Sequence, residues 1–242
     1  MRISRLFLDT PLTEQKILNL EGERLNYLAN VLRLKAGTAL TIFNGQGGEY
    51  TATISEINKR SANIEIGQFS ETNLESPLNI TLAQGISRGE RMDFTLQKAT
   101  ELGVNRIIPL FTERCTVNLK AERLKKRLQH WQGVVQSACE QSGRNQIPLI
   151  ESAQDFATFL EQETDQCQIL LDPFSSQTLK SISTAPSSIM ILIGPEGGFS
   201  NKEREQAYAK NYQGIQLGPR ILRTETAAIA TISAIQALWG DF

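Results

Sequence analysis

Residues 191–203, ILIGPEGGFSNKE, join an apolar run to a polar, glycine-rich turn. The apolar run predicts a buried β-strand that ends at Gly194, and the glycines beyond it allow a ligand to approach the backbone closely. Ser200 and Glu203 have the S-x-x-E spacing of a capping box, which predicts that a helix begins at Ser200. A strand, an open turn and a capped helix are therefore expected in succession.

A second stretch of similar design follows at residues 215–228, IQLGPRILRTETAA. Another apolar segment ends at Gly218, and a short polar loop leads into an alanine-rich helix. Thr224 is expected to cap this helix, and Glu225 then lies in the first turn, where the helix dipole favours a carboxylate. Two such loops so close in sequence suggest that one ligand is held between them. The alternative is a pair of tight strand-to-helix turns without a ligand.

From residue 79 onward, segments typical of strands alternate with segments typical of helices. This alternation predicts an α/β fold with a mostly parallel sheet, in which ligands bind beyond the carboxyl ends of the strands. The expected strands are NITLAQGI (79–86), NRIIPLF (105–111), IPLIES (147–152), CQILLD (167–172), SSIMILIG (187–194) and GIQLG (214–218). The expected helices cover residues 92–104, 121–143, 153–162, 200–210 and 224–239. Both glycine loops lie at the ends of expected strands.

Residues 1 to about 70 are β-rich instead. TALTIF (38–43) and EYTATISEI (49–57) flank the loop NGQGG, the pattern of a hairpin, and ANIEI (62–66) is a third strand. Residues 22–37 have the leucine spacing of a short helix. The polar stretch 68–78 contains a proline and has no periodicity, so it is expected to link two domains. These domains are expected to be residues 1–72 and residues 73–242.

The two glycine loops lack the spacing of a site for nucleotide phosphates. Neither G-x-G-x-x-G nor G-x-x-x-x-G-K-[ST] is present, and Glu196 would repel a phosphate group. A neutral or cationic ligand therefore fits better than a nucleotide polyphosphate. The same absence disfavours a Rossmann-type dehydrogenase.

The composition is typical of a globular protein, with 40% hydrophobic and 21% charged residues and a net charge of -1. No apolar run approaches the roughly 20 residues that a membrane span needs, and the first residues lack a signal peptide's long apolar stretch. Three widely spaced cysteines and a single histidine, His130, predict neither a disulfide framework nor a metal site. A cytoplasmic location is expected.

Positive charge is concentrated locally. Residues 87–144 contain eleven Lys and Arg against six Asp and Glu. If these cations share a face, they form a candidate nucleic-acid surface; the alternative is a set of solvated helix faces.

The paired loops also carry a family resemblance. IGPEGGFSNKE followed by LGPRILRTETAA resembles the signature of the RsmE family, the ribosomal RNA small-subunit (uracil-N3) methyltransferases of the SPOUT class. The similarity extends to RGERMDFTLQKATELGV, PLFTERC, ACEQSGRNQIP and NYLANVLRLKAG, and so covers nearly the whole chain. Asn30 stands where the family is expected to have a histidine.

The resemblance implies a fold and a cofactor. The C-terminal domain should be a SPOUT domain with a deep trefoil knot, the N-terminal domain a PUA-like β-barrel that helps to hold RNA, and the protein a homodimer. The implied cofactor is S-adenosylmethionine, whose sulfonium and lack of phosphate agree with the carboxylate at Glu196. The implied cofactor contacts are Leu171, Ile193, Gly194, Glu196, Gly197, Leu217, Gly218, Ile221, Leu222 and Arg223.

The implied reaction is methylation of uridine N3 in 16S ribosomal RNA of the 30S subunit, near the decoding centre. This reaction needs a base for the N3 proton and a stabiliser for the developing negative charge. The candidates are Glu225 as base and Arg223 as the partner of the uracil. Alternatively, Glu225 only stabilises the helix and water takes the proton. The implied RNA contacts are Arg2, Arg5, Arg33, Arg88, Arg91, Arg114 and Arg144, each of which could instead form a structural salt bridge.

Two rival functions remain open at this stage. One is a SPOUT enzyme that methylates a ribose 2'-hydroxyl of rRNA or tRNA. The other is a non-catalytic RNA-binding protein with purely structural loops.

Overall fold

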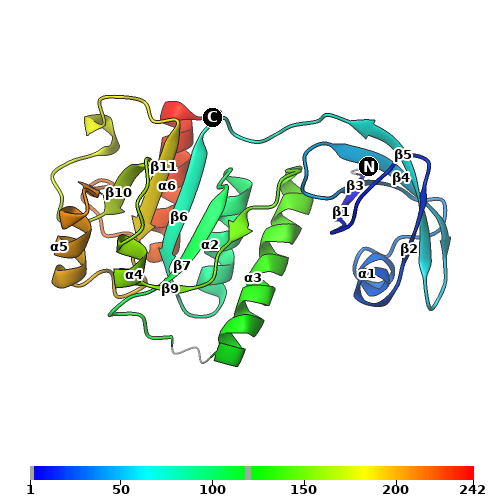
Figure 1. Cartoon of the computed structure of the whole chain (residues 1–242), viewed down its shortest axis with the longest axis horizontal. Helices are drawn as coiled ribbons and strands as arrows, with labels where there is room; N and C mark the ends of the chain where they lie inside the picture. Colours follow the sequence, from blue (N-terminus) through cyan, green and yellow to red (C-terminus); the bar gives the residue numbers. More distant parts are fainter. Residues whose placement is uncertain (1–2, 118–120) are drawn as a thin grey trace. The chain divides into compact units, whose positions relative to one another are not determined.

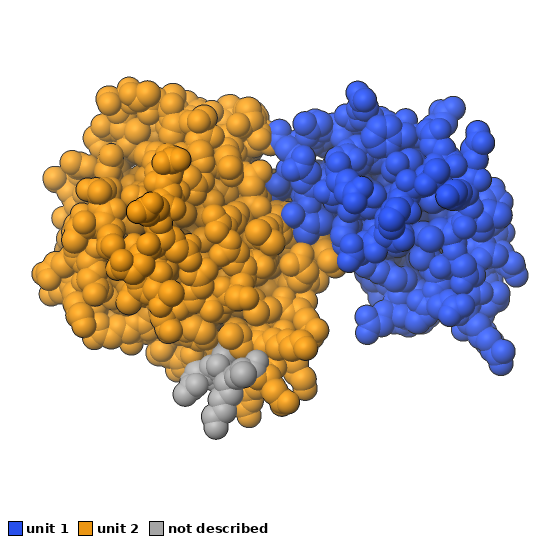
Figure 2. Space-filling model, in the orientation of Figure 1, with its two compact units in different colours: residues 1–75, 139–147 blue, residues 76–138, 148–242 orange. Residues whose placement is uncertain are grey.

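The computed structural model describes residues 3–117 and 121–242, which form two compact units (Figure 1 and Figure 2). The first unit comprises the chain up to Glu75 together with Cys139–Ile147, and the second comprises Ser76–Ala138 and Pro148–Phe242. The expected division into residues 1–72 and 73–242 had placed Cys139–Ile147 in the C-terminal domain. Each unit has a hydrophobic core of its own.

A mostly antiparallel sheet is the framework of the first unit. Its strands are β1 (Ser4–Phe7), β2 (Ile17–Leu20), β3 (Ala39–Phe43), β4 (Glu49–Ile57) and β5 (Ala62–Ser70). Their order in the sheet is β1-β3-β4-β5-β2, with β1 and β3 parallel and the other neighbours antiparallel. Buried and exposed residues alternate through the middle of β4 and the start of β5, as expected for a sheet with one face on a core. The three predicted strands and their glycine loop are confirmed.

The predicted helix over residues 22–37 is wrong in length. Helix α1 covers Gly22–Asn26 and continues into a single π-helical turn, η1 (Tyr27–Val31). Leu28 is buried, as the leucine spacing predicted, whereas Val31 is 61% exposed. Hydrogen bonds in a π-helix span five residues, so the rotation per residue changes and the helical spacing no longer identifies the buried face.

The predicted linker over residues 68–78 begins later than expected, because β5 extends to Ser70. Phe69 lies opposite Tyr50 on β4, with ring centroids 5.0 Å apart, and this cross-strand pair extends the sheet. Strands β1 and β2 were not predicted. Each has four residues and pairs with a strand distant in sequence, so a local pattern does not reveal them.

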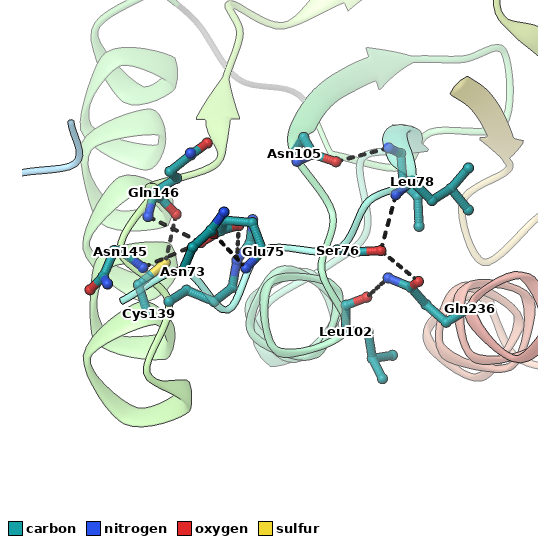
Figure 3. A network of polar contacts seen from close by, with 12 residues as sticks. Asn73, Glu75, Ser76, Leu78, Leu102, Asn105, Cys139, Asn145, Gln146 and Gln236 are labelled. Carbon is teal, nitrogen blue, oxygen red and sulfur yellow. Dashed lines mark hydrogen bonds and ion pairs between the residues drawn. The ribbon is translucent and has the colours of Figure 1, made fainter. Parts of the chain in front are cut away.

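The segment Cys139–Ile147 contributes to the interior of the first unit. Side chains at both ends of the segment pack with Phe7 and Phe43 in a small buried cluster. The Glu75 carboxylate accepts hydrogen bonds from two backbone N–H groups of the segment, at 3.2 and 3.3 Å (Figure 3). The segment is therefore held by both apolar packing and a buried carboxylate.

A parallel sheet is the framework of the second unit. Its strands are β6 (Asn79–Gly85), β7 (Arg106–Phe111), β8 (Leu149–Ile150), β9 (Gln154–Asp155), β10 (Cys167–Leu171), β11 (Ser188–Ile193) and β12 (Gln213–Ile215). Their order is β12-β10-β11-β6-β7-β8, with β9 beside β7, and these neighbouring pairs are parallel. The predicted α/β fold with a mostly parallel sheet is confirmed. β9 was not predicted, since residues 153–162 were expected to be helical.

Helices cover the sheet. They are α2 (Glu90–Glu101), α3 (Ala121–Ser142), α4 (Phe156–Leu160), α5 (Asn201–Ala209) and α6 (Thr224–Trp239), with a 3-10 turn η2 (Leu179–Ser181) (Figure 1). Helices α2 and α6 pack together and α6 contacts β11, whereas α4 and α5 share a core with alternate residues of the central strands. β11 is almost wholly buried, which explains its uninterrupted apolar sequence.

The carboxyl end of α6 is tied to the end of α2. The Gln236 side chain accepts a hydrogen bond from the Ser76 hydroxyl at 2.9 Å and donates one to the Leu102 carbonyl at 2.8 Å (Figure 3). The Gln236 side chain is buried, and its two bonds fix the last helix against the first one of this unit. Across the described ranges, no helix has the length and apolar character needed to cross a membrane.

Candidate functional site

Three neighbouring strands of the second unit end at one cavity. Strand β10 lies between β11 and β12, and the three are parallel, so their carboxyl ends meet at the same edge of the sheet. The residues that follow each strand, 172–174, 194–199, 216–218 and 220–222, line a cavity of about 300 Å³. The expected position of a ligand site, beyond the strand ends and between the two glycine loops, is therefore occupied by a real cavity.

Most of the residues expected to contact a cofactor line this cavity. They are Leu171, Ile193, Gly194, Glu196, Gly197, Leu217, Gly218, Ile221 and Leu222. Arg223 is not among the lining residues; it is exposed and stands at the N-cap of α6. The structure thus brings all of the predicted cofactor contacts except Arg223 to the wall of this cavity. That they contact a cofactor stays a prediction.

The first loop needs its glycines for steric reasons. A Cβ on Gly194 would lie 3.0 Å from the backbone of Gly198, and Gly198 itself has φ +64°. The predicted capping box at the start of α5 is confirmed: the Ser200 hydroxyl accepts from the Glu203 N–H, and the Glu203 carboxylate accepts from the Ser200 N–H. The same carboxylate also accepts from the Glu113 N–H at 2.7 Å, which anchors the helix start to the end of β7.

The second loop differs from the prediction at Thr224. The N-cap of α6 is Arg223, and Thr224 is the first helical residue, so Thr224 does not cap the helix. Its hydroxyl instead donates to the Gly194 carbonyl at 2.6 Å and accepts from the Gln84 side chain at 2.9 Å. This hydroxyl therefore joins the two glycine loops.

Glu225 lies in the first turn of α6, as predicted. It does not line the cavity, and one of its carboxylate oxygens is buried without a hydrogen-bond partner among the described residues. Such an acceptor is costly to leave unpaired, so this oxygen is a candidate acceptor for a donor from outside the chain.

The Glu196 carboxylate points to a neighbouring turn. It accepts hydrogen bonds from the Arg88 N–H at 2.9 Å and from the Arg91 guanidinium at 3.2 Å. Burial by itself would raise the pKa of Glu196, but these two donors and its own backbone N–H outweigh burial and hold the pKa below its ordinary value. The carboxylate therefore stays ionised and connects the first glycine loop with two arginines expected to bind RNA.

The sequence did not predict an ion pair in the cavity wall, formed by Asp172 and Arg204 with the Phe174 ring beside it. The buried Asp172 carboxylate accepts from the Arg204 guanidinium at 3.0 Å and from the Tyr208 hydroxyl at 2.5 Å. The guanidinium carbon of Arg204 lies 4.7 Å from the centre of the Phe174 ring. Asp172 could have been found from its place at the end of a predicted strand, but no local pattern marks Arg204.

Hydrogen bonding controls the ionisation of this cluster. Burial would raise the pKa of Asp172, but the Tyr208 hydroxyl, the Phe174 N–H and the Arg204 guanidinium together lower it below its ordinary value. Burial, followed by the adjacent Asp172 carboxylate, raises the pKa of Tyr208 to about 12. Asp172 is thus a carboxylate and Tyr208 a neutral donor at physiological pH.

The seven arginines expected to bind RNA lie in different surroundings. Arg88, Arg91 and Arg114 are exposed in the second unit, and the Arg114 guanidinium donates to the Gly197 carbonyl at 3.0 Å in the cavity wall. Arg33 is exposed in the first unit. Arg2 lies outside the described residues.

Arg5 and Arg144 have structural partners instead. The Arg144 side chain is 4% exposed and donates from Nε to the buried Glu75 carboxylate at 2.8 Å. An RNA contact through this guanidinium does not fit the structure, and the alternative of a structural salt bridge replaces it. Arg5 is half-buried, is paired with Glu49 and donates to the Asn145 side chain at 2.5 Å. Neither side chain was distinguishable from a surface arginine in the sequence.

Metal-ligating side chains do not gather in the described part of the chain, where no group of three His, Cys, Asp or Glu could hold an ion.

Burial raises the pKa of the Cys139 thiol to about 12, so this cysteine stays protonated and unreactive.

Two parts of the chain match known protein families. Residues 74–236 match the family described as the RNA methyltransferase domain, and residues 20–67 match the one described as the RNA methyltransferase PUA domain. The first match covers more than half of the chain. The second supports the expected PUA-like N-terminal domain.

Whole-length relatives and solved structures agree with these matches. The chain is 39% identical to ribosomal RNA small subunit methyltransferase E of Buchnera aphidicola (subspecies Schizaphis graminum), over 99% of this chain and 98% of that protein. It is 31% identical to the protein of the same name from Bacillus subtilis, over 96% of both chains.

Two similar structures contain a cofactor. A Legionella pneumophila protein in complex with bound S-adenosylmethionine superposes with a TM-score of 0.97 at 39% identity, over the whole of both chains. A ribosomal RNA small subunit methyltransferase E from Neisseria gonorrhoeae bound to S-adenosylmethionine gives a TM-score of 0.93 at 40% identity, also over both chains. The fold is therefore that of a SPOUT methyltransferase domain with a PUA-like domain before it. From its family matches, its full-length relatives and this fold, the chain belongs to the RsmE family of RNA methyltransferases.

Proposed function

We propose that this protein transfers a methyl group from S-adenosylmethionine to N3 of a uridine in the 16S ribosomal RNA of the small subunit. The observation that carries the proposal is the cavity of about 300 Å³ between the ends of β10, β11 and β12, in a chain that superposes over its whole length on two proteins with bound S-adenosylmethionine. RNA and ribosome specificity follow from the name shared by the full-length relatives.

The chemistry of the cavity suits this cofactor. S-adenosylmethionine supplies a methyl group on a positively charged sulfur and carries no phosphate. The cavity wall combines apolar side chains such as Leu171 and Ile193 with glycine backbone, and it also contains the carboxylate of Asp172. Backbone groups near Gly194 and Gly218 offer donors and acceptors for the adenine, and a carboxylate tolerates the cationic end of the ligand. The ten predicted contacts, with Asp172 and Arg204 added, are the proposed binding residues.

Methylation at N3 requires removal of the imide proton, because the neutral nitrogen has no free nucleophilic lone pair. Glu225 is the proposed base, since it lies in the first turn of α6 beside the second loop and one of its oxygens has no partner among the described residues. Arg223 precedes it, exposed, and is the proposed partner for negative charge on the uracil oxygen.

Exposed arginines beside the cavity are the proposed RNA contacts in this unit. Arg88 and Arg91 are connected to the first glycine loop through Glu196, and Arg114 is hydrogen-bonded to Gly197. Arginine suits phosphate and stacked-base contacts, and a target base in RNA must leave its stack before it can reach the cofactor. A homodimer, a knotted backbone and a cytoplasmic location complete the proposal by family resemblance.

The test uses small ribosomal subunits purified from cells that lack this protein. The subunits are incubated with the protein and labelled S-adenosylmethionine, and the methylated nucleoside is identified by mass spectrometry. A labelled 3-methyluridine is the expected product. A 2'-O-methylated nucleoside would retain the cofactor but contradict the N3 chemistry, and bound cofactor without labelled product would leave an RNA-binding role.

A further inference from the structure

We propose that Gln84 is a positioning residue: from outside the cavity it ties the two glycine loops together through Thr224 and thereby sets the affinity for S-adenosylmethionine. The proposal rests on the proposed function, because it concerns the same cavity. Gln84 belongs to β6, is fully buried and does not line the cavity.

A chain of hydrogen bonds runs from Gln84 to both loops. Its amide nitrogen, which carries two hydrogens, donates to the Thr224 hydroxyl at 2.9 Å and to the Gly85 carbonyl at 3.0 Å, and makes a longer contact with the Gly194 carbonyl at 3.4 Å. The Thr224 hydroxyl in turn donates to the Gly194 carbonyl at 2.6 Å. A threonine hydroxyl has one hydrogen to give and lone pairs to accept with, so both of its bonds can form at once.

Close backbone contact brings β6 within reach of the first loop. A Cβ on Gly85 would lie 2.5 Å from the backbone nitrogen of Pro195, so only glycine permits this approach. The neighbouring Gln84 amide therefore lies under the point where the first loop leaves β11. Because β6 is an inner strand of the sheet, it offers a support to which the loop can be fastened.

The hydrogen bonds join two residues that face the cavity from different loops. Gly194 begins the first loop, Thr224 ends the second, and both line the cavity. Glycines at positive φ, such as Gly198 and Gly218, leave the loops many other conformations. Fixing the ends of both loops to β6 reduces the conformational freedom that would otherwise be lost on binding, and such preorganisation increases affinity.

The orientation of the amide is set by its partners. If its oxygen faced Thr224, no donor would remain for the Gly194 carbonyl, since the single hydroxyl hydrogen cannot serve both. With the nitrogen on that side, the amide oxygen of Gln84 is buried and has no partner within residues 3–117 and 121–242. The amide therefore acts through its nitrogen, which contacts Gly194 of the first loop and Thr224 of the second.

The test measures the dissociation constant of S-adenosylmethionine by calorimetry, with the full-length protein and well below its melting temperature. Gln84→Met removes the amide at similar volume, and Thr224→Val removes the hydroxyl. We expect each to weaken binding about fivefold to tenfold, the equivalent of one buried hydrogen bond. Thr224→Ser should bind like the wild type, and the double variant should be no weaker than the weaker single variant. In turnover assays the KM for S-adenosylmethionine should rise in Gln84→Met, with kcat and the KM for RNA unchanged.

Thr231→Val is the matched control. Thr231 is buried in the same helix and its hydroxyl donates to the Ala227 carbonyl at 2.6 Å, so this variant loses a similar hydrogen bond that joins neither loop to β6. It should bind the cofactor as the wild type does. If Gln84→Met does not fold, Gln84→Asn provides the test, because its amide is too short to reach Thr224 and should weaken binding similarly.

The outcomes separate the two proposals. Wild-type affinity in a folded Gln84 variant, or fully additive losses in the double variant, would overturn the positioning role while leaving the cofactor in place. A loss in Thr224→Val alone would mean that the hydroxyl acts by direct contact with the ligand. If the wild-type protein itself does not bind S-adenosylmethionine, the proposed function fails, and the positioning role fails with it.

Discussion

Replacing Arg144 by methionine removes one half of a buried ion pair and tests whether this arginine is structural. The Arg144 and Glu75 side chains are 4% and 8% exposed. Without the guanidinium, the Glu75 carboxylate stays buried and, among the described residues, keeps the backbone N–H groups of the 139–147 segment, at 3.2 and 3.3 Å. Breaking a buried pair in this way costs about 3–5 kcal/mol. Because two donors remain, the expected loss in the free energy of unfolding is at the lower end of this range, about 3 kcal/mol.

Thermal and urea unfolding, followed by circular dichroism, measure this loss. For a unit of this size, about 3 kcal/mol corresponds to a fall of roughly 10 °C or more in melting temperature. The double variant Glu75→Gln/Arg144→Met should recover most of the stability, because no uncompensated charge stays buried. Arg91→Ala, at an exposed arginine, is the control and should change the free energy of unfolding by less than about 0.5 kcal/mol.

The refuting result is equally definite. If Arg144→Met unfolds within about 1 kcal/mol of the wild type and binds small-subunit RNA more weakly, Arg144 reaches the RNA and the ion pair does not define its role. Equal stability with equal RNA binding would show that the buried pair contributes nothing, which would contradict the desolvation argument itself.

Four further predictions concern the cavity and its surroundings. Gly218→Val, at φ +73°, should strain the second loop and abolish calorimetrically detectable S-adenosylmethionine binding while the circular dichroism spectrum stays unchanged. Glu225→Gln at saturating cofactor should lower the methylation rate at least tenfold, and a wild-type rate would exclude Glu225 as the base. Because the pKa of Asp172 is lowered in the fold, its stabilising effect is full above its unfolded pKa of about 4 and is lost as the pH falls through the lower folded pKa. The stability difference between wild type and Asp172→Asn, from urea titrations, should therefore be largest near neutral pH and shrink in strong acid. Arg91→Ala should weaken RNA binding and flatten its dependence on salt, and an unchanged salt slope would remove Arg91 from the phosphate contacts.

Much of the fold could be predicted because its signals are local. The bounds of β4 and α6 agree with the predicted ones, since alternation over nine residues and an alanine-rich helix after a polar loop are patterns within one segment. The capping box of Ser200 and Glu203 is equally local, as it depends on a spacing of three residues. The position of the cavity followed from a general rule for parallel sheets, which needs only the order of strands and helices.

Other features depend on partners far away in sequence, and these the tertiary structure alone decided. Arg144 is structural because the fold places Glu75 beside it, 69 residues earlier in the chain. Thr224 does not cap its helix as predicted. Its hydroxyl instead donates to the Gly194 carbonyl, 30 residues away in the chain, which the fold places within hydrogen-bond distance. In the sequence, nothing distinguishes Gln84 from the other residues of its strand. Its proposed positioning role depends on its burial and on its hydrogen bond to Thr224, which only the fold creates. The physical reason is common to all three: local patterns determine secondary structure, whereas the partner of a buried polar group is fixed only when distant segments pack together.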